Sequence, residues 1–303
     1  MPPRTYPNPG AFKTALDARL QQQARQDGTS FNRKRMLLVF HRFLARIDRA
    51  FAEAVLLKGG LALELRLTSA RTTRDVDLRM VGSADNLLAR LQDAGLLDLG
   101  DFLRFEVQVD PHHPELRDII YEGRRFKATC TLAGRLYGDP FGVDIGFGDP
   151  VFGAPQTLVA PDDLGFIGIP PPSVKVYPLE THIAEKLHAY TLPRTLPNSR
   201  VKDLPDLALL ASTQPLTATA VRTALAQTFS FRATHPVPHT LPAPPHAWTE
   251  PYDRLARTNG LRWTTLEQLT EAVRGFLDPV LTSAMPLVWS PGAWRWHAAS
   301  AAV

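Results

Sequence analysis

The chain has 303 residues, of which 44% are hydrophobic and 21% charged, so it is long enough for two domains and too apolar to be mainly disordered. Lysine and arginine number 34 against 30 acidic residues, and a formal net charge of +4 by itself selects no class of partner. The single cysteine, Cys130, excludes an internal disulfide and a Cys/His zinc framework. The sequence lacks a signal-like N-terminus and a long apolar run, so we expect a cytoplasmic protein with no membrane role.

The N-terminal half predicts alternating helices and strands. Apolar residues at three- and four-residue steps indicate an amphipathic helix from Ser30 to about residue 54. An apolar run at 55–57, ended by Lys58, Gly59 and Gly60, indicates a buried strand, a tight turn and a helix at about 61–67. A strand is expected at 75–80 and a helix from Ser83 to about residue 93. Another face of the first helix carries four arginines, which could contact an RNA backbone or simply face solvent: Arg35, Arg42, Arg46 and Arg49.

The remaining sequence predicts more strands and then a helical region. Alternating patterns indicate strands at 104–109, 125–136 and 142–147. Prolines interrupt the pattern between residues 160 and 177, and helices are expected at 179–191, 204–211, 217–229 and 265–281. The six prolines between residues 236 and 251 indicate a loop. We therefore predict an α/β domain with a mixed sheet at residues 1–165, followed by a helical domain at 175–303.

Three aspartates are the candidate catalytic groups. Asp75 and Asp77 lie two residues apart on one expected strand, so both project from the same face. Asp144 is flanked by apolar residues on a later strand. Adjacent carboxylates repel unless a cation compensates them, and Mg²⁺ prefers such hard oxygen ligands. Beside a glycine turn whose backbone can approach phosphate, these acids indicate a two-metal phosphoryl-transfer site. The alternatives are arginine-paired or solvated acids for the first pair and a structural hydrogen-bond acceptor for Asp144.

Four segments carry a resemblance to a known family. The sequences at 58–63 and 71–78, with fourteen residues between Gly60 and Asp75, resemble the glycine-turn and paired-aspartate motifs of the AbiEii/AbiGii toxin family of nucleotidyltransferases. The sequence at 185–189 resembles that family's helical lysine motif, and the one at 200–207 resembles its later Lys-Asp signature. The resemblance extends over about residues 55–210. Leu61 stands where the family usually has Thr or Ser, which removes one hydroxyl donor.

The resemblance implies a polymerase-β-like nucleotidyltransferase core with N-terminal helices and a helical C-terminal domain. It implies that Asp75 and Asp77 hold two Mg²⁺ ions, and that Asp144 completes the second site and helps to deprotonate the acceptor hydroxyl. Lys186 and Asp203 would join these acids as catalytic residues. The nucleoside triphosphate would be bound by the remaining motif residues together with Lys186: Lys58, Gly59, Gly60, Lys202 and Asp206.

The expected function is Mg²⁺-dependent transfer of a nucleoside monophosphate from an NTP to an acceptor hydroxyl. The resemblance implies a toxin of a toxin–antitoxin or phage-defence system, neutralised by a cognate antitoxin protein. The expected acceptor is the 3′ end of tRNA, so the reaction would block translation. Two alternatives stay open: nucleotidylation of a small molecule or a protein side chain, and a catalytically inactive nucleotide- or RNA-binding module, which Leu61 would favour.

Overall fold

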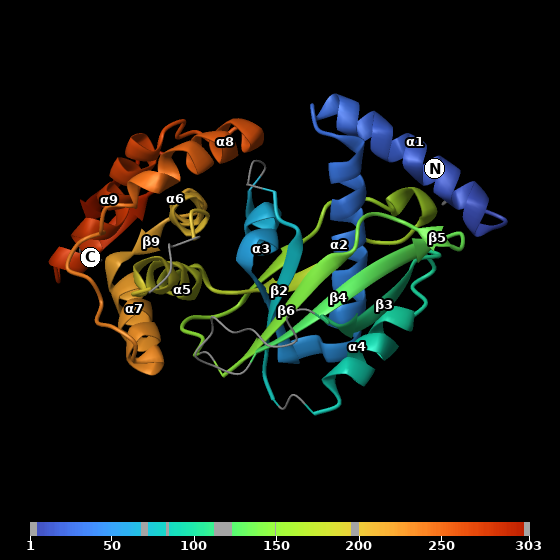
Figure 1. Cartoon of the computed structure of the whole chain (residues 1–303), viewed down its shortest axis with the longest axis horizontal. Helices are drawn as coiled ribbons and strands as arrows, with labels where there is room; N and C mark the ends of the chain where they lie inside the picture. Colours follow the sequence, from blue (N-terminus) through green and yellow to red (C-terminus); the bar gives the residue numbers. More distant parts are fainter. Residues whose placement is uncertain are drawn as a thin grey trace. The chain divides into compact units, whose positions relative to one another are not determined.

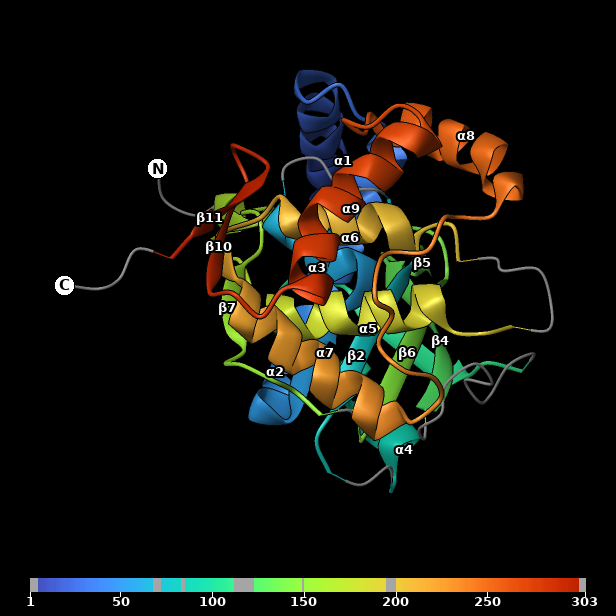
Figure 2. The ribbon, with the colours of Figure 1, turned by 90° about the vertical axis from the view of Figure 1, so that its left-hand side faces the viewer.

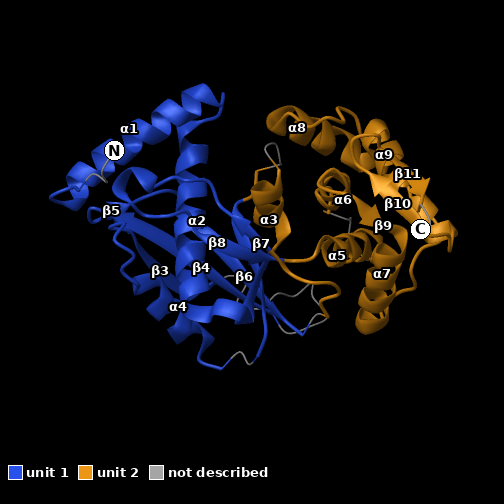
Figure 3. Cartoon of the chain, turned by 180° about the vertical axis from the view of Figure 1, so that it is seen from behind, with its two compact units in different colours: residues 1–57, 74–148, 157–176 blue, residues 58–73, 149–156, 177–303 orange. Residues whose placement is uncertain are grey.

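The computed structural model describes residues 5–67, 72–82, 85–111, 123–148, 150–194 and 200–299 (Figure 1). The chain divides into two compact units, coloured separately in Figure 3. The first comprises residues 1–57, 74–148 and 157–176, and the second comprises 58–73, 149–156 and 177–303. The glycine-turn segment thus groups with the C-terminal residues, which a single boundary between 165 and 175 does not anticipate. Within the described ranges, no helix is long and apolar enough to cross a membrane.

The first unit is built on a mixed sheet with the strand order β3-β4-β6-β2-β1-β8-β7, and β5 pairs with β4. Strands β2 and β6 are parallel, as are β1 and β8, whereas β4 runs antiparallel to both β3 and β6. Its elements are α1 (Pro9–Gln26), α2 (Phe31–Phe51), η1 (Ala52–Ala54), β1 (Val55–Lys58), β2 (Asp75–Met80), α4 (Leu87–Leu96), β3 (Arg104–Val109), β4 (Gly123–Leu132), β5 (Arg135–Leu136), β6 (Phe141–Phe147), β7 (Gln156–Val159), η2 (Gly165–Ile167) and β8 (Ser173–Val176).

Helix α2 covers one face of this sheet. Ser30 caps the helix, because its hydroxyl accepts a hydrogen bond from the Arg33 N–H at 3.1 Å. Phe43 of α2 packs against Phe141 of β6 and Phe105 of β3, with ring centroids 5.3 and 5.4 Å apart. Successive strand residues point to opposite faces, so the even-numbered residues of β6 and the residues in register with them face away from α2. The candidate aspartates lie on that other face.

The second unit is mainly helical. Helices α5, α6, α7 and α9 pack against one another (Figure 2), and their apolar side chains form one core. A small sheet with the order β11-β10-β9 joins this core through the buried Trp289, whose indole N–H donates to the Ala211 carbonyl at 2.7 Å. Its elements are α3 (Gly59–Arg66), α5 (Leu179–Thr191), α6 (Asp203–Ala211), β9 (Leu216–Thr217), α7 (Ala218–Arg232), η3 (His246–Trp248), α8 (Thr249–Asn259), α9 (Leu266–Thr282), β10 (Leu287–Ser290) and β11 (Arg295–Ala298).

Most of the expected elements are confirmed. The bounds of β2, β3 and α5 agree with the sequence pattern, and α2, α3, α6, α7 and α9 differ from it by a few residues at most. Ser83 lies outside the described residues, as does residue 71 of the second motif, and the prediction that Ser83 caps α4 is wrong, because the helix begins at Leu87 with Asn86 at its N-cap position. The sequence pattern did not indicate α1, α8 or the β10-β11 hairpin. Helix α1 is the informative case, because its apolar residues occupy only a narrow stripe: Phe12, Leu16, Leu20 and Ala24.

Candidate functional site

The structure places the three aspartates on one face of two neighbouring strands. Asp77 of β2 lies in register with Asp144 of β6, and Asp75 lies in register with Gly142. A Cβ atom at position 142 would stand 2.5 Å from the Asp75 Oδ1 atom, so the glycine leaves the space that this carboxylate occupies. Asp75 is exposed, and Asp77 and Asp144 are half-buried. The parallel pairing of β2 with β6 therefore brings together acids that are almost 70 residues apart in the sequence.

Asp144 is held by an arginine that the sequence did not single out. Arg125 of β4 lies in register with Asp144, and its Nε and Nη2 atoms donate to the two carboxylate oxygens at 2.7 and 2.5 Å. The hydrogen bonds that Arg125 donates to this carboxylate raise the pKa of Arg125. Both oxygens of Asp144 are therefore engaged in a bidentate ion pair.

These contacts bear on whether the acids fit a metal ion. Asp75 and Asp77 supply hard carboxylate oxygens on a shared face, which is the donor chemistry that Mg²⁺ prefers. Asp144 differs from them, because each of its oxygens already accepts a hydrogen bond from Arg125, whose charge compensates the carboxylate. Consistently, no three His, Cys, Asp or Glu side chains converge to hold a metal ion in the part of the chain that the structure describes.

The glycine turn begins α3 in the second unit. Gly59 has a φ of 68°, a left-handed conformation that glycine adopts without strain. Lys58, just before it, contacts Glu185 Oε2 at 3.2 Å and lies 5.4 Å from the centre of the Tyr177 ring. Leu61 is buried, so the backbone of this turn, rather than the side chain at 61, can face a phosphate.

The later lysine and aspartate motifs meet between α5 and α6. Lys186 Nζ contacts Asp203 Oδ1 at 2.9 Å and Asp206 Oδ2 at 2.8 Å. Both aspartates are buried, whereas Lys202, at the start of α6, is exposed. The second oxygen of Asp203, Oδ2, is buried, has no hydrogen-bond partner among the described residues and lies 3.9 Å from Arg200 Nη1. The structure therefore brings Lys186, Asp203 and Asp206 into one cluster and leaves Lys202 outside its ion pairs.

His182 is a residue of this region that the sequence analysis missed. It lies one helical turn before Lys186 on α5, is fully buried, and neither ring nitrogen has a hydrogen-bond partner among the described residues. Burial, together with the charge of Lys186, lowers the pKa of His182 to about 3. The helical spacing to Lys186 was readable from the sequence, but the absence of a partner is a tertiary property. At neutral pH the imidazole is uncharged.

The arginine stripe on α2 requires a correction. Arg42 and Arg46 are buried and do not present a surface to RNA. Arg42 Nε donates to Asp101 Oδ2 at 2.7 Å, and Arg46 Nη2 donates to Asp101 Oδ1 at 2.7 Å. Burial tends to raise the pKa of Asp101, but the hydrogen bonds and charges of the two arginines outweigh it and lower the pKa. Arg35 is half-buried and Arg49 is exposed, so only these two stay predicted RNA contacts.

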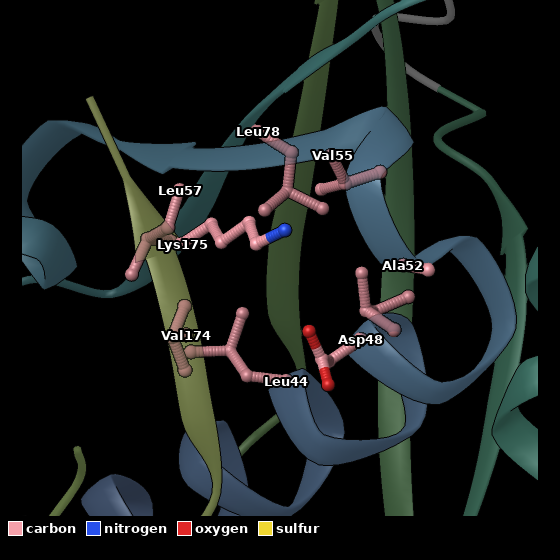
Figure 4. Close-up of a pocket in the computed structure, with 9 residues that line it drawn as sticks. Leu44, Asp48, Ala52, Val55, Leu57, Leu78, Val174 and Lys175 are labelled. Carbon is pink, nitrogen blue, oxygen red and sulfur yellow. The ribbon is translucent and has the colours of Figure 1, made fainter. Parts of the chain in front are cut away.

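A small pocket in the first unit lies apart from the aspartates (Figure 4). Leu78 lines it, and Leu78 points to the opposite face of β2 from Asp77. Among the described residues that line it, only Asp48 and Lys175 are charged, and burial raises the pKa of Asp48 while the Lys175 charge opposes the rise. The pocket therefore belongs to the side of the sheet that α2 covers.

Comparisons with known proteins identify the family and the fold. Residues 42–294 match the family model described as nucleotidyl transferase AbiEii toxin of type IV toxin–antitoxin systems. No curated protein sequence gives a significant match. Among solved structures, MenT4, a nucleotidyltransferase toxin from Mycobacterium tuberculosis H37Rv, aligns with a TM-score of 0.61 at 15% identity, covering 92% of each chain.

Two structures from Helicobacter pylori align more distantly. JHP933 has a TM-score of 0.40 at 13% identity and covers 65% of this chain and 80% of its own. A protein titled putative nucleotidyltransferase has a TM-score of 0.43 at 14% identity and covers 82% and 95%. The alignment with MenT4 supports the expected fold class, and the family model spans most of the chain. The protein is therefore a nucleotidyltransferase and belongs to the AbiEii toxin family of type IV toxin–antitoxin systems.

Proposed function

We propose that this protein transfers a nucleoside monophosphate from an NTP to an acceptor hydroxyl, with Asp75 and Asp77 as the ligands of Mg²⁺. The observation that carries the proposal is the placement of these two carboxylates on one sheet face, with Gly142 leaving room for the first. When bound, Mg²⁺ supplies Lewis-acid stabilisation of the phosphate charge. The acceptor oxygen forms a bond to the α-phosphorus, the bond to the β-phosphate oxygen breaks, and pyrophosphate leaves while the hydroxyl proton passes to solvent.

The nucleotide-binding part of the proposal rests on the second unit. Lys186 binds the triphosphate, and the buried Asp203 and Asp206 hold its ammonium in place. In the glycine turn, the Lys58 ammonium and the backbone N–H groups of Gly59 and Gly60 supply further donors to phosphate oxygens. Lys202 is exposed and adds a positive charge beside the same helix. An ammonium acts on phosphate as a compact point charge, so it tolerates any of the four bases.

We further propose that the acceptor is the 3′ end of tRNA, and that the added nucleotides block aminoacylation and therefore translation. The family supports the role of a toxin with an antitoxin partner. Arg49 is exposed and Arg35 is half-buried, and both offer positive charge to an RNA backbone. Action on tRNA places the protein in the cytoplasm, and growth arrest by such a toxin would fit phage defence.

The direct test incubates the purified protein with each α-labelled NTP, Mg²⁺ and total tRNA. We expect one or more NTPs to label RNA, and we expect Asp75→Asn to abolish the labelling. Glu250→Gln, at an exposed ion pair with Arg254 on α8, is the matched control and should behave as the wild type. Transfer that survives Asp75→Asn would refute the metal assignment. Label found only on a small molecule or on protein would identify that molecule, instead of tRNA, as the acceptor.

A further inference from the structure

The sheet face that carries the aspartates also carries bases, including Arg125 and Lys127 of β4 and Arg79 of β2. Strand β6 separates the acids of β2 from the bases of β4, so in two of the rows that cross these strands the charge changes from negative to positive. Two rows of residues in register show the change: Asp77, Asp144 and Arg125 in one, and Asp75, Gly142 and Lys127 in the other. Such a gradient suits a substrate whose phosphates bind a metal ion at one end and cationic side chains at the other.

Asp144 binds two of the three guanidinium nitrogens of Arg125 and leaves the third without a contact to it. Its Nε and Nη2 atoms bind Asp144, whereas Nη1 makes no hydrogen bond with any residue in the described ranges. The Arg125 side chain keeps 33% of its surface exposed, against 14% for Asp144. Because a guanidinium is planar, the bidentate contact also sets the direction of the remaining N–H groups. The pair therefore presents oriented donors on the face that carries Asp75 and Asp77.

Resting on the proposed function, we infer that Arg125 contacts a substrate phosphate and that Asp144 is its positioning residue, not a metal ligand. A metal ion on Asp144 would have to use the second lone pair of an oxygen that already accepts a hydrogen bond from Arg125, and it would be repelled by the charge of that guanidinium. The bound phosphate belongs either to the NTP or to the acceptor RNA. In both cases the guanidinium would compensate negative charge on that phosphate.

The first test measures metal binding without catalysis, by electron paramagnetic resonance of Mn²⁺. The double variant Arg125→Gln/Asp144→Asn removes one charge of each sign, so it keeps the net charge of the face. We expect it to bind Mn²⁺ within about threefold of the wild type, while Asp75→Asn weakens binding at least tenfold. If the double variant loses Mn²⁺ as strongly as Asp75→Asn does, Asp144 is a metal ligand and the inference is wrong.

The second test measures phosphate binding. Calorimetry with each MgNTP and filter binding with tRNA form two arms, and the arm that weakens in Arg125→Gln identifies the phosphate. A charge-assisted hydrogen bond predicts a loss of about 10- to 100-fold. Asp144→Asn should weaken binding in the same arm by a similar factor. The double variant should bind no more weakly than Arg125→Gln, because Asp144 acts only through the guanidinium of Arg125.

Melting temperatures show whether each variant folds. If Asp144→Asn alone fails to fold, the double variant still tests the inference. Unchanged affinity in both arms for Arg125→Gln would overturn its assignment. A wild-type protein that binds neither Mn²⁺ nor any MgNTP would instead refute the proposed function itself.

Discussion

His182 makes the stability of this protein depend on pH in a way that one substitution can isolate. Its pKa is about 3 in the folded protein, against an ordinary value of 6.5. Between these values the unfolded chain binds a proton that the folded chain does not, so acidification favours unfolding. With 1.36 kcal/mol per pKa unit, this histidine lowers the free energy of unfolding by about 2 kcal/mol between pH 7.5 and pH 5.

The perturbation is His182→Leu, which fills similar space and has no group to protonate. At pH 7.5 we expect the variant to be at least as stable as the wild type, because it removes two buried nitrogens without partners, each of which costs about 1–3 kcal/mol. Between pH 7.5 and pH 5 it should lose about 2 kcal/mol less stability than the wild type. Urea unfolding at the two pH values measures both quantities.

The control is His239→Leu, since His239 is an exposed histidine of the same unit, and it should leave the difference between the two pH values unchanged. Two results would refute the reasoning. One is an equal loss of stability on acidification in His182→Leu and the wild type. The other is a variant strongly destabilised at pH 7.5, which would mean that the imidazole does have a hydrogen-bonding partner that it needs.

Three further predictions concern the ion pairs and the acid face. Asp101→Asn leaves two buried arginines poorly compensated and should cost about 3–5 kcal/mol in urea unfolding, and a loss below about 1 kcal/mol would contradict the burial of that network. Gly142→Ala forces the flexible Asp75 carboxylate aside, so Mn²⁺ affinity should fall while stability changes by less than about 1 kcal/mol; unchanged affinity would argue against Asp75 as a ligand. Lys186→Met should abolish NTP retention in equilibrium dialysis and destabilise the protein by about 3–5 kcal/mol, whereas Lys202→Met, at an exposed position, should shift stability by about 0.5 kcal/mol or less.

The local patterns predicted elements well because helices and strands follow the periodicity of their own residues. Strand β2 is an example: alternation alone put Asp75 and Asp77 on one face, and the structure agrees. The same logic misjudged α2, where four arginines at helical spacing looked like a solvent face. Two of them, Arg42 and Arg46, are buried and donate hydrogen bonds to Asp101, which lies 59 and 55 residues further along the sequence.

The missed residues of the site share a cause. Arg125 reaches Asp144 through an antiparallel register that no local pattern specifies, because the connection between β4 and β6 could have aligned other residues. His182 stands at a readable helical position, but its lack of a partner depends on how α5 packs. The sequence could therefore place chemical groups on elements, while the pairing between elements determined which groups meet.

The central claim is that this fold transfers a nucleotidyl group through a site that includes Asp75. The position of the transferred label tests it most directly, by comparing α-labelled and γ-labelled NTP under identical conditions with tRNA and Mg²⁺. Nucleotidyl transfer predicts that the α label enters the RNA, that the γ label leaves as pyrophosphate, and that Asp75→Asn stops both. Incorporation of the γ label, or α-label incorporation that persists in Asp75→Asn, would contradict the account.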